Sequence, residues 1–219
     1  MEAKPKIPRP TVKRLSLYLR EVGLLAAAGR RTVSSKQLGS ALGLTGAQVR
    51  KDLAFFGQLG HPGIGYEITR LHAHLRQVLG RDRTWNAALV GVGNIGRALL
   101  AYQRFAQEDF HITAVFDSSD RAIGQEYGGR AVHGMDDMPA LVRQHEIKLG
   151  ILAVPADSAQ HVADLLIEAG VTGSLNFAPR RLDVGDTISV TSVDFTLALE
   201  QLAFQVSAGL TGSFVDTND

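Results

Sequence analysis

Apolar residues recur three and four positions apart through most of the first third of the chain, the spacing of helices with one buried face. The pattern predicts a long helix over residues 11–29, a short helix over 34–43 and a third helix that begins at Thr45. A fourth helix is expected to be capped by Thr69 and to end at Gly80. This part of the chain is therefore predicted to form a small, mainly helical unit.

The third predicted helix follows the second after a tight turn, and Thr45 and Gln48 occupy the positions of a capping box. Its apolar residues, Val49 and Leu53 among them, share one face. Small side chains and two cations share the opposite face: Ala47, Arg50, Lys51 and Ala54. Two short helices joined in this way are typical of a helix-turn-helix, whose second helix enters the DNA major groove. Gly46, at the start of that helix, allows a phosphate to approach closely. The candidates for contact with DNA in this segment are Thr45, Gly46, Ala47, Gln48, Arg50 and Lys51.

A glycine-rich stretch over residues 57–68 ends in alternating apolar residues, which predicts a β-hairpin. A hairpin in this place is typical of the wing of a winged helix, and Gly63 and Tyr66 are candidates for contact with DNA. The alternative for the whole segment is a small helical interaction domain that binds no nucleic acid.

Charge divides the chain unevenly, although the formal net charge of all 219 residues is only +1. Residues 1–80 contain 13 of the 23 Lys and Arg but only 4 of the 22 Asp and Glu, which gives a formal charge of +9. Residues 81–219 therefore carry −8. An asymmetry of this size favours a nucleic-acid-binding part joined to a second part of different function, although a basic face that meets only solvent would have the same composition.

From Trp85 onward, short apolar runs alternate with helical segments. Strands are predicted over 85–90, 110–116, 130–133, 148–154, 173–177 and 187–190. Such alternation indicates an α/β fold with a doubly wound parallel sheet. Because these sheets bind ligands at the carboxyl ends of their strands, the residues that follow two of the strands are candidates for a cofactor wall: Val154, Pro155, Asn176 and Phe177.

The first of these strands runs directly into the glycine motif Gly91-Val92-Gly93-Asn94-Ile95-Gly96 and then into a helical pattern. In such a strand-turn-helix the first glycine permits the turn, the second lets the backbone approach a pyrophosphate, and the third lets the helix pack closely. Asp117 follows the next strand, 21 residues beyond Gly96, the spacing at which a carboxylate reaches an adenosine ribose. The motif predicts dinucleotide binding, with a purely structural turn or a related nucleotide-carrying ligand as the alternative.

The last helical pattern runs from Phe195 to about Leu210 and carries apolar residues on one stripe: Leu199, Leu202, Ala203 and Val206. Asp194 stands at its start, where the helix dipole favours a carboxylate. An exposed apolar helix is typical of a partner interface, so this helix is expected to join two copies into a homodimer. Packing of the helix back onto its own sheet is the alternative.

Composition argues against several classes of site. The chain has no cysteine, so neither disulfides nor thiolate–metal sites can form. Its seven histidines are scattered, which argues against a metal site, and no Ser-His-acid or paired-carboxylate set suggests an enzyme. No apolar run approaches the ~20 residues that span a bilayer, and the first residues lack the apolar segment of a secretion signal. A soluble, cytoplasmic protein that binds neither membrane nor metal is expected.

Several of these motifs occur together and in the same order in one family. Over about residues 9–210 the chain resembles the redox-sensing transcriptional repressors of the bacterial Rex family. The resemblance rests on the segments 45–57, 63–66, 91–96, 154–156, 175–179 and 193–195. It implies a homodimer whose winged helices bind double-stranded DNA at an inverted-repeat operator and whose Rossmann domains bind NADH or NAD+, with NADH releasing the DNA. Pro62 departs from the family pattern, because relatives commonly have Lys or Arg at that position in the wing.

The predicted organisation is a winged-helix domain over 1–80, a Rossmann domain over 81–193, and a dimerisation helix and tail over 194–219 that is exchanged between subunits. Two rival functions share parts of this pattern. An NAD-dependent oxidoreductase would need a substrate domain, yet the predicted sheet ends near Val190 and only one helix follows. A CoA-binding Rossmann protein with an appended basic domain shares the glycine loop but leaves Asp117 unexplained.

Only the oxidised nicotinamide ring carries a charge, and this difference predicts a redox switch. An apolar pocket favours NADH, because burying an unpaired charge is costly, and Tyr102, on the first Rossmann helix, and Phe195 are the candidates for its lining. We expect Asp117 to favour NAD(H) over NADP(H) by repelling a 2′-phosphate. We also hypothesise that NADH lets Asp194 engage Arg20 of the first helix, the alternative being that Asp194 only caps its own helix.

Overall fold

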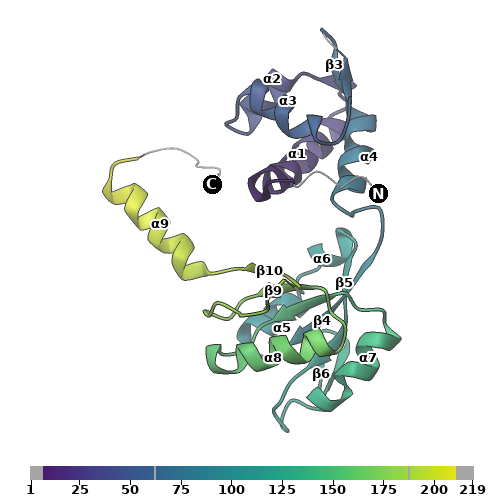
Figure 1. The fold of residues 1–219 in the computed structure, drawn as a ribbon, viewed down its shortest axis with the longest axis vertical. Coiled ribbons are helices and arrows are strands. Elements are labelled where there is room, and N and C mark those ends of the chain that lie inside the picture. Colours follow the sequence, from purple (N-terminus) through teal and green to yellow (C-terminus); the bar gives the residue numbers. More distant parts are fainter. Residues whose placement is uncertain (1–6, 62, 187, 211–219) are drawn as a thin grey trace. The chain divides into compact units, whose positions relative to one another are not determined.

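The computed structural model describes residues 7–61, 63–186 and 188–210, so Pro62 lies outside the described residues. The chain forms two compact units, one that ends at Arg83 and one that runs from Thr84 to Leu210 (Figure 1). None of the helices in these ranges combines the length and apolar character needed to cross a bilayer. Within the same ranges, no three His, Asp or Glu side chains are grouped so that they could hold a metal ion.

The N-terminal unit is a winged helix, and its described residues form four helices and a small antiparallel sheet. The helices are α1 (Arg9–Ala27), α2 (Ser35–Ala41), α3 (Gly46–Ala54) and α4 (Ile68–Val78). The strands are β1 (Thr32–Val33), β2 (Gly60–His61) and β3 (Gly65–Glu67), with β3 in the middle. The predicted hairpin is thus confirmed, and β1, too short to show a pattern of its own, adds a third strand.

The apolar faces of these helices meet in one core. Its fully buried members include Tyr18, Leu38, Val49, Leu71 and Leu75, each at most 1% exposed. Burial of a large apolar side chain stabilises a fold by roughly 1.5–3 kcal/mol relative to exposure. The position of α3 is therefore determined by the residues on its inner face, which leaves its outer face free for other contacts.

Side chains cap the starts of α2 and α3. At α2 the side chains of Ser34 and Gln37 form a complete capping box, each accepting a hydrogen bond from the other residue's backbone N–H, at 3.1 and 2.9 Å. At α3 only half of the predicted box forms. The Thr45 hydroxyl accepts from the Gln48 backbone N–H at 3.1 Å, but the Gln48 side chain does not return to Thr45 and donates to Asp52 instead.

The predicted cap of the fourth helix is wrong. α4 begins at Ile68, directly after β3, and Glu67 occupies the cap position without a side-chain hydrogen bond. The backbone N–H of Ile68 donates to the carbonyl of Arg31, next to β1, at 2.9 Å. The backbone of Arg31 therefore satisfies the first N–H of α4, and Thr69 lies inside the helix rather than at its cap.

The described strands of the second unit form one seven-stranded sheet in the order β10-β9-β8-β4-β5-β7-β6. They are β4 (Trp85–Val90), β5 (Phe110–Phe116), β6 (Glu126–Tyr127), β7 (Arg130–His133), β8 (Leu149–Leu152), β9 (Gly173–Asn176) and β10 (Ser189–Ser192). All neighbours are parallel except β6 and β7. The chain proceeds outward from β4 through β5 and β7 and returns to β8 on the other side of β4, so the topological switch point lies between β4 and β8. The doubly wound sheet is confirmed.

Helices cover both faces of the sheet. A 3-10 turn (Met135–Asp137), α7 (Met138–Gln144) and α8 (Ala156–Glu168) lie on one face, and α5 (Asn94–Leu100) and α6 (Arg104–Gln107) lie on the other. Along β4, Ala88 and Val90 belong to the first core and Ala87 and Leu89 to the second. This alternation is the two-residue period of a strand that is buried on both sides.

The helix after the glycine loop differs from its prediction. The sequence places Tyr102 on this helix, with Ile95 and Leu99 on the same face, but α5 ends at Leu100 and Tyr102 lies in the turn that leads to α6. Ile95 and Tyr102 are 39% and 50% exposed, so neither belongs to the core. Gly96 packs against the start of the glycine loop, where a Cβ would collide with the Gly91 carbonyl oxygen.

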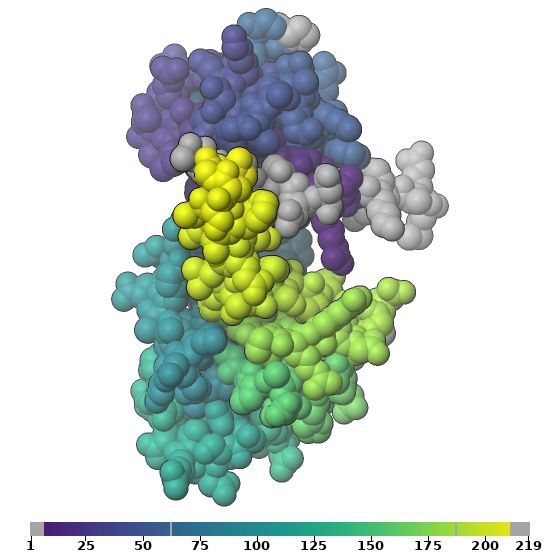
Figure 2. Space-filling model, turned by 90° about the vertical axis from the view of Figure 1, so that its left-hand side faces the viewer, coloured from purple at the N-terminus to yellow at the C-terminus, as the bar shows by residue number. Residues whose placement is uncertain are grey.

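The end of the second unit follows the prediction with small shifts. β10 covers Ser189–Ser192 rather than 187–190, and Thr187 lies outside the described residues. α9 (Phe195–Ser207) begins as predicted and ends three residues before the expected position. None of its residues is buried, and its side chains, coloured yellow, lie at the surface in Figure 2.

Candidate functional site

The outward face of α3 carries the cations that the sequence assigns to DNA. Ala47, Arg50, Lys51 and Ala54 are all exposed, whereas Val49 on the opposite side is buried. The predicted division of this helix into a core face and an outward face is confirmed. The small side chains of Ala47 and Ala54 let the helix axis approach another surface closely. A cationic helix face of this shape is suited to a groove lined with hydrogen-bond acceptors and bordered by phosphates.

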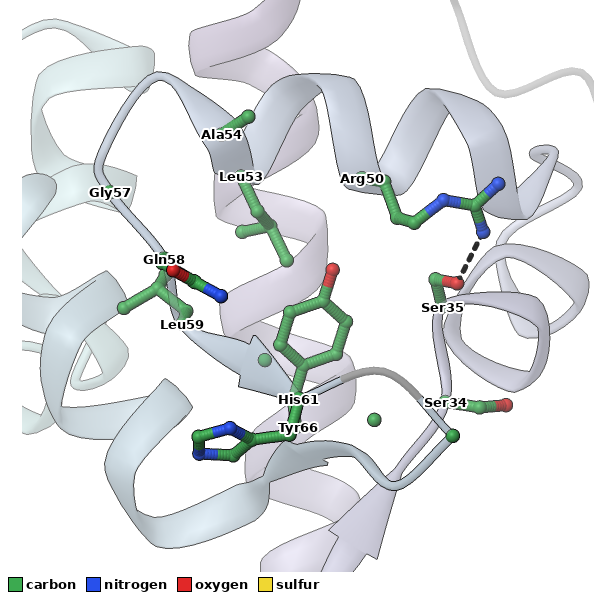
Figure 3. Close-up of a pocket in the computed structure, with 13 residues that line it drawn as sticks. Ser34, Ser35, Arg50, Leu53, Ala54, Gly57, Gln58, Leu59, His61 and Tyr66 are labelled. Carbon is green, nitrogen blue, oxygen red and sulfur yellow. Dashed lines mark hydrogen bonds between the residues drawn. The ribbon is translucent and has the colours of Figure 1, made fainter.

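A cavity of about 500 Å³ lies between α3 and the wing, and Arg50 is among its lining residues (Figure 3). Arg50 Nη1 donates to the Ser35 hydroxyl, at the start of α2, at 2.8 Å. Tyr66 lines the same cavity from β3, but the residue is only 7% exposed and belongs to the core, and burial raises the pKa of its hydroxyl. Tyr66 can therefore offer little more than its hydroxyl to a ligand. Gly63 lies in the wing turn, with a φ of +80°.

A buried carboxylate ties α3 to α1, and the sequence analysis missed it. Asp52 is 1% exposed and accepts hydrogen bonds from the Thr11 hydroxyl at 3.2 Å, from Arg14 Nε and Nη2 at 2.7 and 2.8 Å, from the Tyr18 hydroxyl at 2.7 Å and from Gln48 Nε2 at 2.9 Å. We call these five residues the Asp52 network. Burial alone would raise the pKa of Asp52, but the bonds from Arg14, Tyr18 and Gln48 outweigh it and hold the pKa below its ordinary value.

The glycine loop lies at the carboxyl end of β4, next to the switch point, and Asn94 and Ile95 open α5 behind it. Gly91 has a φ of +94°, a conformation that residues with side chains rarely adopt. Gly93 differs, because nothing in the described part of the chain lies within 4 Å of the place where its Cβ would be. The space beside Gly93 is thus open, as a ligand that approaches the backbone requires.

Asp117 lies beside this loop, as its spacing predicts. Its Oδ2 accepts from the Val92 backbone N–H at 2.8 Å, and its Oδ1 accepts from the Ser119 backbone N–H at 2.9 Å. The carboxylate therefore joins the end of β5 to the loop after β4. Each carboxylate oxygen can accept a further hydrogen bond, so Asp117 can still receive ribose hydroxyl groups.

The candidate wall residues lie at neighbouring strand ends but differ in their roles. Val154 and Pro155 follow β8, which pairs with β4, so they lie at the same edge of the sheet as the glycine loop. Asn176 is completely buried: its Nδ2 donates to the carbonyls of Ala178 and Arg180 at 3.2 and 2.9 Å, and its Oδ1 accepts from the Ala178 N–H at 2.9 Å. The Asn176 amide therefore shapes the loop after β9.

The two aromatic candidates for the nicotinamide pocket are both exposed, Tyr102 at 50% and Phe195 at 59%. The Phe195 ring centroid lies 6.1 Å from that of Phe177, whereas Tyr102 packs edge-on against Phe105 at 5.1 Å. Among the ring contacts of the described residues, none joins Tyr102 to Phe195 within this single chain. The structure thus brings Phe177 and Phe195 together, and a pocket that includes Tyr102 stays a prediction.

Asp194 forms the cap that the alternative prediction expected. Its Oδ1 accepts from the backbone N–H groups of Thr196 and Leu197 at 2.8 and 3.2 Å. Arg20 is exposed on α1, in the other unit. The capping role is therefore visible, and the pairing of Asp194 with Arg20 stays a prediction.

α9 presents apolar side chains beyond the predicted stripe. Leu197 and Phe204, outside that stripe, are 53% and 68% exposed, and Leu199 and Val206, within it, are 65% and 71% exposed. Scattered apolar residues are normal on a protein surface, but a contiguous set of this kind marks an interaction site.

Two family models match the chain: "CoA binding domain" over residues 82–180 and "Putative DNA-binding protein N-terminus" over residues 6–54. Among curated proteins, the redox-sensing transcriptional repressor Rex of Carboxydothermus hydrogenoformans is 45% identical over 201 residues, which cover 92% of this chain and 97% of that protein. The chain belongs to the Rex family. The resemblance inferred from its motifs is confirmed.

Further Rex relatives agree in length and fold. Rex of Syntrophobacter fumaroxidans is 38% identical over 93% of this chain and 98% of its own. The Rex-family repressor RSP in complex with β-NAD+ and operator DNA is 30% identical, with a TM-score of 0.89 over 94% of this chain and 95% of its own. RSP in complex with β-NADH is 29% identical, with a TM-score of 0.84 over 94% of this chain and 97% of its own.

Proposed function

We propose that this Rex-family chain is a DNA-binding repressor that senses the NADH/NAD+ ratio. As a homodimer it binds an inverted-repeat operator through its winged helices, and NADH bound to the second unit releases the DNA. The observation that carries the proposal is the presence, in one chain, of an exposed cationic face on α3 and an open glycine loop beside Asp117. RSP, solved with operator DNA and β-NAD+ and also with β-NADH, supports the same assignment.

The residues of α3 support contact with DNA in distinct ways. Arg50 can read guanine O6 and N7 with two parallel hydrogen bonds, and Lys51 can neutralise a phosphate. Thr45 and Gly46, at the start of the helix, can approach a phosphate, and Ala47 fits beside a thymine methyl group. The Arg50–Ser35 hydrogen bond holds the guanidinium near the wing before DNA arrives.

Asp117 supports a nicotinamide adenine dinucleotide as the ligand. A carboxylate beside the loop accepts from ribose hydroxyl groups and repels the phosphorylated ribose of NADP(H) or of CoA. The matching CoA-binding model covers the same part of the chain, so ligand chemistry has to separate the two assignments. A non-enzymatic role is supported by the relatives, which are named repressors.

α9 supports assembly into a homodimer. A second copy presents the same exposed apolar helix, so two copies can bury what one leaves exposed. Two-fold symmetry also suits an inverted-repeat operator, because the symmetry of such DNA mirrors that of the dimer. Exchange of α9 between subunits would bring Phe195 of one subunit to the nicotinamide of the other.

The proposed switch begins at an apolar pocket formed by Tyr102, Phe177 and Phe195. Such a pocket favours NADH, because the charged ring of NAD+ loses its hydration there. Coupling requires only that NADH bind one form of the dimer more tightly than the other. In the form that NADH favours, Asp194 engages Arg20 and the winged helices no longer match the operator.

A fluorescence-anisotropy titration tests this function. The DNA probe is a labelled duplex that the wild-type protein enriches from a randomised library. We expect NADH to release the probe, and we expect NAD+, NADPH and CoA at the same concentration to leave it bound. Release by CoA, or no release by NADH, would contradict the proposed cofactor. Failure to enrich any duplex would contradict DNA binding itself.

A further inference from the structure

Gln48 occupies the first turn of α3, where recognition helices place the residues that contact base edges. It is the third helical residue, it is half-buried, and its helical neighbours Ala47 and Lys51 are exposed. The side chain thus lies where the core face meets the outward face. Any contact between Gln48 and a base depends on which of its polar atoms remain available.

The Asp52 network decides which way the Gln48 amide points. Gln48 Nε2 lies 2.9 Å from Asp52 Oδ1, and an ionised carboxylate can only accept hydrogen bonds. The nitrogen end of the amide must therefore face Asp52, and a flipped amide would set two acceptors against each other. Asp52 itself cannot turn away, because Arg14 holds both of its carboxylate oxygens, through Nε at 2.7 Å and Nη2 at 2.8 Å.

The groups left on the Gln48 amide match one base better than the others. A glutamine amide has two N–H donors and one carbonyl acceptor, and one donor is used by Asp52. One donor and one acceptor remain, which is the complement of the N7 acceptor and N6 donor that adenine presents in the major groove. Guanine presents two acceptors at N7 and O6 and would need both donors.

We infer that Gln48 reads an adenine in the operator and that Asp52 is the positioning residue that orients it, an inference that rests on the proposed function. Asp52 does not touch DNA. It acts through the amide it holds, so its effect is expected in base preference as well as in stability.

The first test compares wild type and Q48M in selection from a randomised duplex library. Met keeps the length of the side chain and removes both polar groups. We expect wild type to enrich adenine over guanine at a position where Q48M shows no such preference. Replacing that adenine by purine, which lacks the N6 amino group, should weaken wild-type binding about 3- to 10-fold, the range of one lost hydrogen bond, and leave Q48M unchanged.

The second test separates positioning from stability with D52N and Y18F. The carboxamide introduced by D52N can donate as well as accept, so it no longer fixes the Gln48 amide, and the adenine-to-guanine preference should fall toward one. Y18F removes a hydrogen bond to the same carboxylate but leaves the Gln48–Asp52 bond. It should therefore retain the preference even if it unfolds more readily.

The outcomes separate failure of this inference from failure of the proposed function on which it rests. If the wild type enriches no duplex, the proposed DNA binding fails. If the wild type binds a defined operator and Q48M keeps the same adenine preference, Gln48 does not read adenine and this inference is overturned while the repressor function stands. If folded D52N keeps the adenine-to-guanine preference, Asp52 does not orient Gln48 and its positioning role is overturned. If D52N does not fold, the Q48M and purine experiments decide the inference through Gln48.

Discussion

Asp52 and Asp117 each lie beside the element that would meet a ligand, one in the winged helix and one in the Rossmann unit. Asp52 is 1% exposed and takes donors from the side chains of two helices, among them the charged Arg14. Asp117 is half-buried and takes two backbone N–H groups at the edge of the glycine loop. A carboxylate surrounded by side-chain donors becomes a clamp between helices, whereas one held by backbone groups alone keeps room for a ligand.

This contrast follows from how much space each set of hydrogen-bond donors leaves around its carboxylate. The Asp52 network closes around its carboxylate, so its removal strands Arg14 and Tyr18 without their acceptor. The backbone donors of Asp117 approach from the loop and from its own turn, beside the open space at Gly93. Substitution of Asp52 should therefore change stability most, and substitution of Asp117 should change ligand choice most.

The largest effect is expected for Asp52→Ala. Breaking a buried ion pair on one side typically costs about 3–5 kcal/mol, and this loss should appear as earlier urea unfolding of the winged helix followed by circular dichroism. Trp85, the single tryptophan, lies in the second unit and provides the control. Its fluorescence transition should stay in place; an equal shift of both transitions would contradict a clamp confined to the winged helix.

Asp117→Asn should change cofactor selectivity by about 1.5–3 kcal/mol, the usual range for a hydrogen bond to a charged group. Removing the charge removes the repulsion of a 2′-phosphate, so the affinities for NADH and NADPH should approach each other. Isothermal titration with both cofactors measures the ratio. Asp120→Asn, at an exposed acid three residues away, is the matched control and should leave the ratio unchanged.

Asp194 offers a third carboxylate with which to sharpen the comparison. If it pairs with Arg20 in the NADH form, Asp194→Ala and Arg20→Ala should both bind NADH yet hold DNA in its presence, a loss of about 1–3 kcal/mol of coupling. The double variant should lose no more of the response to NADH than either single variant does. If Asp194 only caps α9, the anisotropy titration will show an intact NADH response, with a dimer less stable by about 0.5–2 kcal/mol.

The smallest expected effect is the pH dependence that Asp52 gives to the stability of the winged helix, because it appears only in acid. Its pKa is lower in the folded state than in the unfolded chain, so its stabilisation is complete above the unfolded pKa and is lost as the pH falls through the folded pKa. The free energy of unfolding of the winged helix should therefore fall on acidification below about pH 4. Asp52→Asn should flatten this acid dependence in urea unfolding measured over a pH series. An unchanged slope would show that other carboxylates carry it.

Local patterns predicted most of the elements and part of the site. The spacing of Val49 and Leu53 identified the inner face of α3, and the apolar run that ends at Val90 identified β4 as a buried strand. The glycine motif and the distance to Asp117 identified the cofactor loop. Each of these features depends on residues within one turn or strand, or on a spacing that a strand-turn-helix imposes.

The sequence predictions that failed, and the one residue they missed, all concern positions where the local pattern alone did not decide the structure. Thr69 has the side chain of a cap, but a carbonyl next to β1 supplies the bond that α4 needs. Tyr102 falls on a helical period, but α5 ends at Leu100, so Tyr102 lies outside the helix. The one available signal for Asp52 was an acid directly before the buried Leu53, at the edge of the core face of a helix.

By itself, then, the sequence determined which faces of the helices and strands are buried, where the chain turns on glycine, and to which family it belongs. Only the tertiary structure decided what surrounds Asp52, because Tyr18 and Thr11 lie 34 and 41 positions away along the chain. No periodic pattern relates residues that far apart. They meet because the apolar faces of α1 and α3 pack in one core, and that packing brings the donors on α1 to a carboxylate that could not otherwise remain buried and charged.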